Sequence, residues 1–301
     1  MRTVTYSIVA RDAETGQLGV AVQTCMFAVG SVVPWVRAGV GAVASQAIAE
    51  SAYGPRCLDG MAEGETAATA LDAAVAADPM SALRQVGVVA ADGSVAATTG
   101  ELCIDHAGHQ LGDGFAVQAN MMRSPEVWPA MAEAFTASSG PLAQRLLTTL
   151  AAGEAAGGDA RGRMSAALVV VEGVVPAAPG GGTVVDLRVD RSEDPIGDLT
   201  RLLVAADSYA GFSRAVDQLF GGDPVAALST VDDALGLLPG EENLRFLRSG
   251  ALIASGATDD GVAELRSLVA EQPGWGVIVR GFVAKGLVAL PEGVDLDAVL
   301  G

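Results

Sequence analysis

This sequence of 301 residues contains a single lysine, Lys285. A mechanism that needs a lysine base, a Schiff base or a lysine phosphate clamp is therefore excluded from the region before that position. Histidine is scarce too, and a Ser-His-Asp triad could use only His106 or His109. No Gly-x-Ser-x-Gly nucleophile elbow occurs, which argues against that class of hydrolase.

Cysteines and long apolar runs are also few. Cys25, Cys57 and Cys103 are too scattered to form a disulfide framework, which favours a reducing compartment. The longest apolar runs, such as 165–171, are far shorter than the roughly 20 residues of a membrane-spanning helix. The start, MRTVTYSIVARD, has no long apolar stretch typical of a secretory leader. We therefore expect a soluble, cytoplasmic protein.

Basic residues are outnumbered by acidic ones, 18 to 36, which gives a net charge of −18. Such a chain repels both a polyphosphate backbone and an anionic membrane surface. Nucleic acid and membranes are thus not expected as partners, and we expect a small-molecule substrate instead.

Short runs of β-branched and small apolar residues predict strands in the first two thirds of the chain. They lie at 5–10, 18–22, 40–44, 86–91, 94–98, 115–119, 165–171 and 183–189. The pair around Asp92-Gly93 is typical of a two-residue hairpin. Helix-compatible stretches lie at 53–77, with a break near Gly64, and at 125–137 and 142–153. This order favours an α+β fold with antiparallel sheets and segregated helices.

After Asp194-Pro195 the sequence becomes continuously helix-forming, and we divide the chain into domains at 1–210 and 211–301. The second domain contains a weak repeat, because Pro239 and Pro273 lie 34 residues apart in similar surroundings. Thirty-four is the period of tetratricopeptide helix hairpins, of which about three are needed for a stable array. Two hairpins should therefore pack against the first domain or a second subunit, and we expect a homo-oligomer, most simply a dimer.

Several segments together resemble the domain-of-unknown-function family number 1028. They include TYSIVARDAETGQLGVAVQT, FAVGSVVPWVRAGVGAVASQA, RQVGVVAADG, AGHQLGDGF, QANMM and AAGGDARGRMSAALVVV. The resemblance runs through about residues 5–200 in the expected order. That family is regarded as similar to N-terminal-nucleophile (Ntn) hydrolases, which implies a four-layer αββα sandwich followed here by a small all-α, tetratricopeptide-like module.

The resemblance implies a catalytic role for Thr5. Ntn hydrolases use a Thr, Ser or Cys at the start of a central strand as nucleophile and its free α-amino group, with a pKa near 8, as base. Here Arg2 would block the removal of Met1, so that exposing Thr5 requires cleavage after Val4. The alternative is a threonine chosen only for its β-propensity.

The same resemblance points to three further residues near strand ends. Asn120, in a segment that the family writes with Gly before the Asn, would donate to the oxyanion of a tetrahedral intermediate, or be an ordinary turn residue. Asp159 would orient the nucleophile, and Arg161 would bind a substrate carboxylate. A salt-bridged loop is the alternative for this pair.

Four other residues are candidates for substrate binding. Arg37 could hold a carboxylate or lower the pKa of a nearby amine, or be a surface arginine. Ser45 and Gln46 follow a predicted strand, where they could face a cleft or simply hydrogen-bond within the domain. His109, in the family-like AGHQLG, is interpreted as a structural or substrate-contacting residue.

The residue types of a metal site occur together only around Cys103, Asp105, His106 and His109. Their spacing matches no common zinc signature, so we expect neither metal nor cofactor. Metal-assisted hydrolysis through this segment remains an alternative.

The hypothesis favoured by these patterns is hydrolysis of a small amide or other C–N bond by a threonine nucleophile. A non-catalytic Ntn-like scaffold or binding protein is the rival. If the first is right, Thr5, Arg37, Asn120 and Asp159 should converge on one cleft at the end of the central sheets.

Overall fold

The structure is a computed structural model that describes residues 5–178, 180–286 and 295–300. The chain divides into two compact units, Met1–Leu203 and Val204–Gly301. The boundary lies within one long helix, α5 (Pro195–Phe220), and the division between residues 210 and 211 drawn from the sequence falls in the same helix. Each unit is described by itself below.

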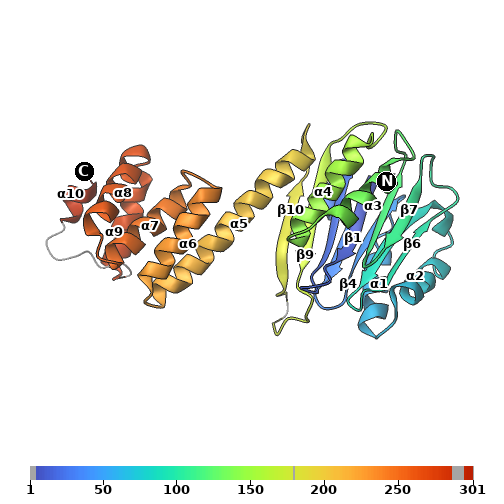
Figure 1. The fold of residues 1–301 in the computed structure, drawn as a ribbon, viewed down its shortest axis with the longest axis horizontal. Helices are drawn as coiled ribbons and strands as arrows, with labels where there is room; N and C mark the ends of the chain where they lie inside the picture. The colour runs from blue at the N-terminus through green and yellow to red at the C-terminus, as the bar shows by residue number, and fades with distance from the viewer. Residues whose placement is uncertain (1–4, 179, 287–294, 301) are drawn as a thin grey trace. The chain divides into compact units, whose positions relative to one another are not determined.

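The first unit contains two antiparallel sheets (Figure 1). The larger has the order β10-β9-β2-β1-β8-β7, and the smaller has the order β3-β4-β5-β6. The strands of the larger sheet are β1 (Thr5–Arg11), β2 (Leu18–Thr24), β7 (Gly108–Gly112), β8 (Phe115–Asn120), β9 (Ser165–Val171) and β10 (Thr183–Val189). Those of the smaller sheet are β3 (Pro34–Arg37), β4 (Gly41–Ala47), β5 (Arg84–Ala90) and β6 (Val95–Thr99).

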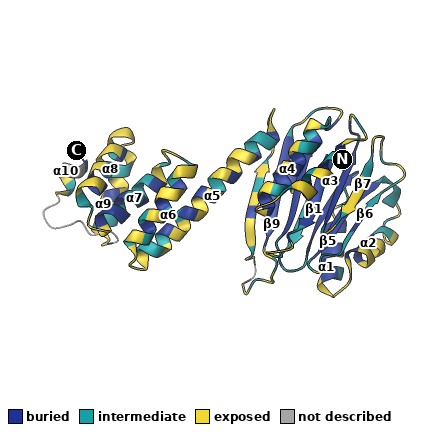
Figure 2. Cartoon of the chain, in the orientation of Figure 1, coloured by how far each residue is buried: buried dark blue, intermediate teal, exposed yellow. Residues whose placement is uncertain are grey.

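Helices cover the outer face of each sheet. The helices α1 (Tyr53–Ala62) and α2 (Ala67–Ala76) share an apolar cluster with the smaller sheet. The helices α3 (Val127–Ala137) and α4 (Leu142–Ala155) share another with the larger one. A third cluster lies between the sheets. The order of layers is therefore helices, sheet, sheet, helices, and both faces of the central strands are buried (Figure 2).

The period of two along a strand explains this layering. In β1, Tyr6, Ile8 and Ala10 join the cluster beneath α3 and α4, whereas Val9 joins the cluster between the sheets. Side chains alternate between the faces of a strand, so a strand buried on both faces needs a continuous apolar run. The sequence predicted β1, β2, β9 and their neighbours for this reason.

The mixed α/β architecture with antiparallel sheets is confirmed, but two strands and one turn differ from the predictions. Strands β3 and β7 were not predicted: β3 begins at a proline, and both are edge strands of four or five residues. The hairpin between β5 and β6 is also longer than two residues, because Ala90 N donates to Ser94 O across a loop in which Gly93 has φ +91°. A three-residue loop with a left-handed glycine suits this geometry.

The second unit consists of helices within the residues that the structure describes. They are the end of α5, then α6 (Pro224–Leu237), α7 (Glu242–Ala254), α8 (Thr258–Glu271), α9 (Gly274–Ala284) and α10 (Leu296–Leu300). One apolar cluster joins α5, α6 and α7, and another joins α7 to α8, α9 and α10. Pro239 and Pro273, the two ends of the 34-residue spacing, both lie between helices.

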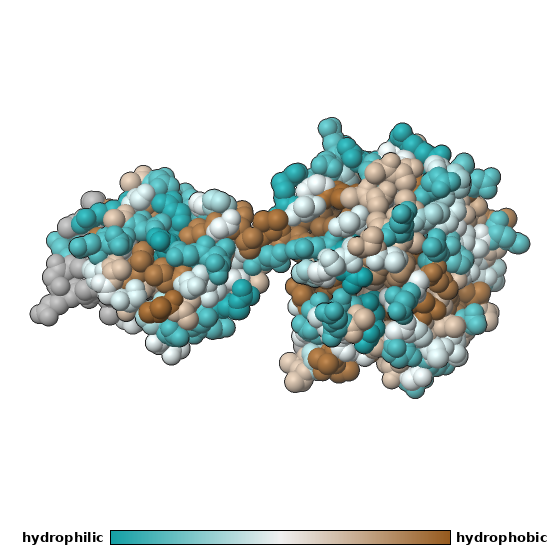
Figure 3. All heavy atoms as spheres, viewed as in Figure 1, coloured by the Kyte–Doolittle hydropathy of each residue, from teal (hydrophilic) through white to brown (hydrophobic). Residues whose placement is uncertain are grey.

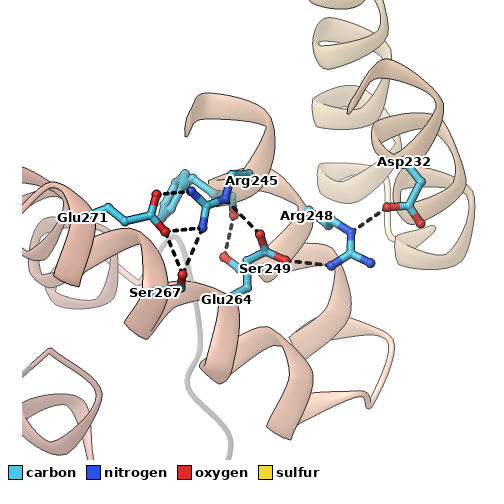
Figure 4. Close-up of polar contacts among 8 residues, drawn as sticks. Asp232, Arg245, Arg248, Ser249, Glu264, Ser267 and Glu271 are labelled. Carbon is cyan, nitrogen blue, oxygen red and sulfur yellow. Dashed lines mark hydrogen bonds and ion pairs between the residues drawn. The ribbon is translucent and has the colours of Figure 1, made fainter. Parts of the chain in front are cut away.

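Two arginines of α7 tie three of these helices together (Figure 4). Arg245 pairs with Glu264 at 3.2 Å and with Glu271 at 2.7 Å, both on α8. Arg248 pairs with Glu264 at 2.7 Å and with Asp232, on α6, at 2.6 Å. The hydrogen bond from Arg245 lowers the pKa of Glu271 to about 2.

On the viewed face, hydrophilic and hydrophobic residues are interspersed over each unit (Figure 3). Among the residues that the structure describes, no helix has the length and apolar character needed to cross a membrane.

The position of α5 gives a first prediction. Leu199 and Leu203 are buried in the apolar cluster of the first unit, and Ile196 packs against it. A chain that ends at Asp207 should therefore fold, whereas one that ends at Asp194 should lose about 4 kcal/mol of unfolding free energy, since burying each such side chain contributes about 1.5–3 kcal/mol. Urea unfolding of the two chains measures the difference. Equal stability would show that α5 is no part of the first core.

The second prediction concerns the ion pairs of α7 and α8. A lowered pKa in the folded state means that ionised Glu271 stabilises the fold above its ordinary pKa of 4.5, and that this contribution is lost as the pH falls to about 2. Hydrogen exchange of the α7 and α8 amides, corrected for its intrinsic pH dependence, should show this loss. The variant Glu271→Gln should show a smaller loss over the same range. An unchanged pH profile in the variant would refute the assignment.

Candidate functional site

The space between the two sheets is apolar at one end and polar at the other. The apolar end holds Val9, Val20, Ala42 and Val89 among others. The polar end begins where β1 begins, and its side chains are fully buried: Thr5, Ser7, Gln46, Gln85, Gln118 and Asn120. Burying polar groups is unfavourable unless they are hydrogen-bonded. The concentration of buried polar side chains at this end therefore makes it the candidate functional site.

Strand register brings these residues together from distant parts of the chain. In the larger sheet Thr5 lies opposite Thr24 on one side and Asn120 on the other. In the smaller sheet Gln46 lies opposite Gln85. A hydrogen bond of 3.1 Å from Gln46 Nε2 to the main-chain oxygen of Thr5 joins the two sheets at this end.

Gln85 is the anchor of the hydrogen-bond network. Its Nε2 donates to Ala119 O at 2.8 Å, to Gly108 O at 3.2 Å and to the hydroxyl of Thr99 at 2.9 Å. Main-chain carbonyls can only accept, so these contacts fix which end of the amide is the nitrogen. Gln85 Oε1 must then accept, and it does so from Gln46 Nε2 at 2.7 Å and Asn120 Nδ2 at 2.8 Å.

The network continues through Ser7. The Ser7 hydroxyl donates to Gln46 Oε1 at 2.5 Å and accepts from Gln118 Nε2 at 2.7 Å. The Gln118 amide lies against Gly87, where an added Cβ would come within 2.2 Å of Gln118 Oε1. Glycine at this position is therefore required by the close approach of the amide.

Three polar atoms at this end are closed to solvent and have no hydrogen-bond partner within the described part of the chain: Thr5 Oγ1, Asn120 Oδ1 and Gln118 Oε1. The last of these lies against Gly87. Thr5 and Asn120 are cross-strand neighbours with side chains on the same face of the sheet. Buried polar atoms without partners are rare and often coincide with function, so this pair is the centre of the candidate site.

Asp159 lies at the same end of the larger sheet. It forms an isolated bridge with Met122, two residues after Asn120. Its buried carboxylate accepts from the main-chain N–H of Cys25 at 3.1 Å and from that of Arg161 at 2.9 Å. Asp159 therefore fixes the chain that follows Thr24, the neighbour of Thr5. Its role here is positioning.

The surroundings of the nearby Cys25 thiol disfavour its thiolate form. Burial, and then the charge of Asp159, raise the pKa of Cys25 to about 11. A thiol with so high a pKa is protonated at neutral pH, and the thiolate is the reactive form.

Arg37 does not join the site, contrary to the predicted convergence. It pairs with Gly41 at the start of β4, whereas Gln46 lies near the other end of that strand. Five residues of strand correspond to about 17 Å. The Arg37 guanidinium instead pairs with Asp59 of α1 at 2.7 Å. Arg37 is the last residue of β3, a short strand that runs away from the site.

Ser45 is also directed elsewhere, because successive residues of a strand face opposite sides. Its hydroxyl donates to Glu50 O at 3.0 Å, while Gln46 faces the other sheet. Of the adjacent pair of candidates, only Gln46 belongs to the network. Arg161 pairs with Asp159 at 3.4 Å and is thus engaged in the loop, with part of its side chain exposed.

His109 contacts the network at its edge. Its Nδ1 lies 2.8 Å from the hydroxyl of Thr99, which also accepts from Gln85. Partial desolvation of the ring lowers the pKa of His109 below its ordinary value of 6.5, which favours a neutral imidazole at neutral pH. The Cys103 thiol donates to Arg84 O at 3.5 Å. Within residues 5–178, 180–286 and 295–300, no group of three or more His, Cys, Asp or Glu residues is arranged to hold a metal.

Three residues of the network, Ser7, Gln85 and Gln118, were missed from the sequence, and so was a fourth buried polar residue, Gln23. Gln23 is buried on the opposite face of the larger sheet, beside Tyr6, and neither of its amide atoms has a partner in the described region. The available signal was a glutamine or serine inside an otherwise apolar strand, as in TYSIVA, RQVGVV and AVQAN. Such a residue is expected to face a polar partner.

These features define an α+β protein with two facing antiparallel sheets and a buried polar site at one end between them. The chain belongs to the family of unknown function DUF1028, whose model matches residues 5–199. It is also similar to a protein of that family from Silicibacter pomeroyi, known from a crystal structure. The two are 33% identical with a TM-score of 0.60, over 66% of this chain and 88% of the other. No curated protein matches the chain.

The role of Gln85 as anchor gives a prediction about stability. In Gln85→Glu an ionised oxygen would face the carbonyls of Ala119 and Gly108, and we expect a loss of about 3 kcal/mol of unfolding free energy at pH 7. A neutral carboxylic acid can donate as the amide does, so the pKa of this glutamate would be raised and stability should recover as the pH falls toward about 4.

Urea unfolding at pH 7 and pH 4.5 measures both effects. Gln85→Met, which has no group that titrates, is the control and should show no recovery. A Glu variant that is as stable as the wild type at pH 7 would contradict the anchoring role.

Proposed function

We propose that this protein hydrolyses a small amide or other C–N bond, with Thr5 as an N-terminal nucleophile. The observation that supports the proposal is the Thr5 hydroxyl itself, which lies at the start of a central strand, buried and unpartnered, beside a network of fixed amides. The order of layers described above is the order expected of an Ntn-hydrolase-like sandwich. The chain belongs to the DUF1028 family, which is regarded as similar to such hydrolases.

The proposed reaction needs Thr5 to be the first residue. Cleavage of the Val4–Thr5 bond would free an α-amine with a pKa near 8, which can take the proton of the hydroxyl. Thr5 Oγ1 then attacks the substrate carbonyl carbon, the C–N bond breaks, and the amine leaves with a proton. Water hydrolyses the resulting ester and restores the hydroxyl. Residues 1–4 lie outside the described residues.

The other site residues take supporting roles in this proposal. Gln46 and Asn120 both donate to the main-chain oxygen of Thr5, at 3.1 Å and 3.3 Å, and so hold the nucleophile residue in place. Asp159 positions the chain beyond Thr24. The reaction as proposed uses no cofactor, and neither Arg37 nor Ser45 takes part.

We propose the second unit to be a helical-repeat module of two hairpins that mediates assembly. The equal placement of Pro239 and Pro273 between helices supports a repeat, and the shared arginine network of α7 joins its hairpins. Two hairpins are fewer than a stable array needs, so we propose that they assemble the protein as a homodimer in the cytoplasm.

A non-catalytic scaffold is the second candidate function. The observation that favours it is the complete burial of Thr5, because a nucleophile must meet its substrate. Under this reading the polar end between the sheets only joins them, and the N-terminus stays intact.

Two measurements separate the candidates. Intact mass should show the loss of residues 1–4, and a screen of small amides and ureido compounds should reveal turnover. Thr5→Ala should then reduce turnover by at least about 10³-fold, as removal of a nucleophile does in other hydrolases, with unchanged circular dichroism. Thr5→Ser, which keeps a hydroxyl, should retain measurable turnover. An intact N-terminus together with no turnover would favour the scaffold.

A further inference from the structure

The orientation of the Asn120 amide follows from main-chain carbonyls. Ala119 O and Gly108 O hold Gln85 Nε2, so Gln85 Oε1 faces Asn120. Asn120 Nδ2 accordingly donates to Gln85 Oε1 at 2.8 Å and to Thr5 O at 3.3 Å. Rotating the amide by half a turn would set its oxygen against these two acceptors, in a place that water does not reach.

Asn120 therefore presents an acceptor to the site. Both hydrogens of Nδ2 are committed, so this group does not donate to an oxyanion as the sequence suggested. What remains is Oδ1, which is buried, unpartnered in the described chain, and on the same face as the Thr5 hydroxyl. A ligand N–H placed beside the nucleophile would satisfy this buried acceptor, and an unpaired acceptor is unfavourable.

The surroundings of this acceptor carry no net charge from the network. Its members are amides and hydroxyls: Thr5, Ser7, Gln46, Gln85, Gln118 and Asn120. The ion pair of Asp159 with Arg161, at this end of the larger sheet, joins one negative and one positive side chain. A carboxylate ligand has only acceptor oxygens, so it could not satisfy Asn120 Oδ1 as an N–H can.

We propose that Asn120 Oδ1 accepts a hydrogen bond from an N–H of the substrate, so that the site selects neutral amides and ureido compounds over esters and carboxylates. This assignment rests on the proposed function, because the bound amide is a substrate only if the protein hydrolyses it. Recognition itself needs no bond to break and can be measured separately from turnover.

An isosteric ligand pair tests the proposal. N-Methylpropionamide and methyl propanoate have the same shape and differ only in N–H against O at the critical position, while propionate adds charge. Their binding to the wild-type full chain, with its N-terminus determined by mass, is followed by NMR titration. The same spectra show any hydrolysis, since propionate appears as product.

We expect the amide to bind at least about 10-fold more tightly than either of the other two, as one well-placed hydrogen bond allows. In Asn120→Leu, which keeps the volume but lacks the acceptor, the ratio of amide to ester should fall to within about twofold. Circular dichroism checks that this variant folds. If it does not, the wild-type ranking alone decides.

Equal binding of amide and ester, tighter binding of propionate, or no binding of any of the three would overturn the proposal, as would an undiminished ratio in Asn120→Leu. Turnover distinguishes this failure from that of the proposed function. A protein that hydrolyses amides without preferring N–H would remain a hydrolase and refute the role of Asn120. A protein that binds the amide preferentially but never hydrolyses it would support the role of Asn120 and contradict the proposed hydrolase function.

Discussion

The hydrogen bonds from Gln85 to two main-chain carbonyls are the constraint on which the rest of the site depends. They join β5 of one sheet to β7 and β8 of the other and fix the direction of one amide. Every further orientation follows by matching donors to acceptors, first at Gln46 and Asn120, then at Ser7. A site built in this way has little freedom to rearrange, which suits a pre-organised binding place.

The fold was largely predictable because its strands are buried on both faces. Continuous apolar runs such as Ser165–Val171 leave little choice of structure, and Gly64, with φ +98°, ends α1 where the sequence placed a break. The short edge strands were not predictable on the same grounds. In β7 the residues His109, Gln110 and Leu111 are exposed, so neither alternation nor apolar content marked the segment as a strand.

The site was only partly predictable, for a related physical reason. Motif resemblance located Thr5, Asn120 and Asp159 near strand ends, and strand register places them at one end of the sheet. Arg37 and Ser45 lie outside the network, because nearness in sequence to a strand end does not state which end or which face a residue occupies. Register and pleat decide both, and they depend on pairing partners far away in the chain.

The orientation of each side-chain amide in the network could not be predicted from the sequence. The family resemblance implied a donor role for Asn120, but an asparagine side chain offers both donors and an acceptor. Its role depends on the neighbours that accept hydrogen bonds from its N–H groups, because these leave only the amide oxygen without a partner. Here those neighbours are Gln85 and the main chain at Thr5.

The division of the inter-sheet space into an apolar and a polar end also affects how the first unit can come together. The apolar end would tolerate a sliding or loosely docked pair of sheets, since packing of small side chains such as Ala42, Ala44 and Ala116 has little directionality. The polar end would not, because each amide finds its partners in a single register. The buried glutamines thereby restrict the two sheets to a single alignment. Each sheet with its own helices would then depend on the other sheet to fold.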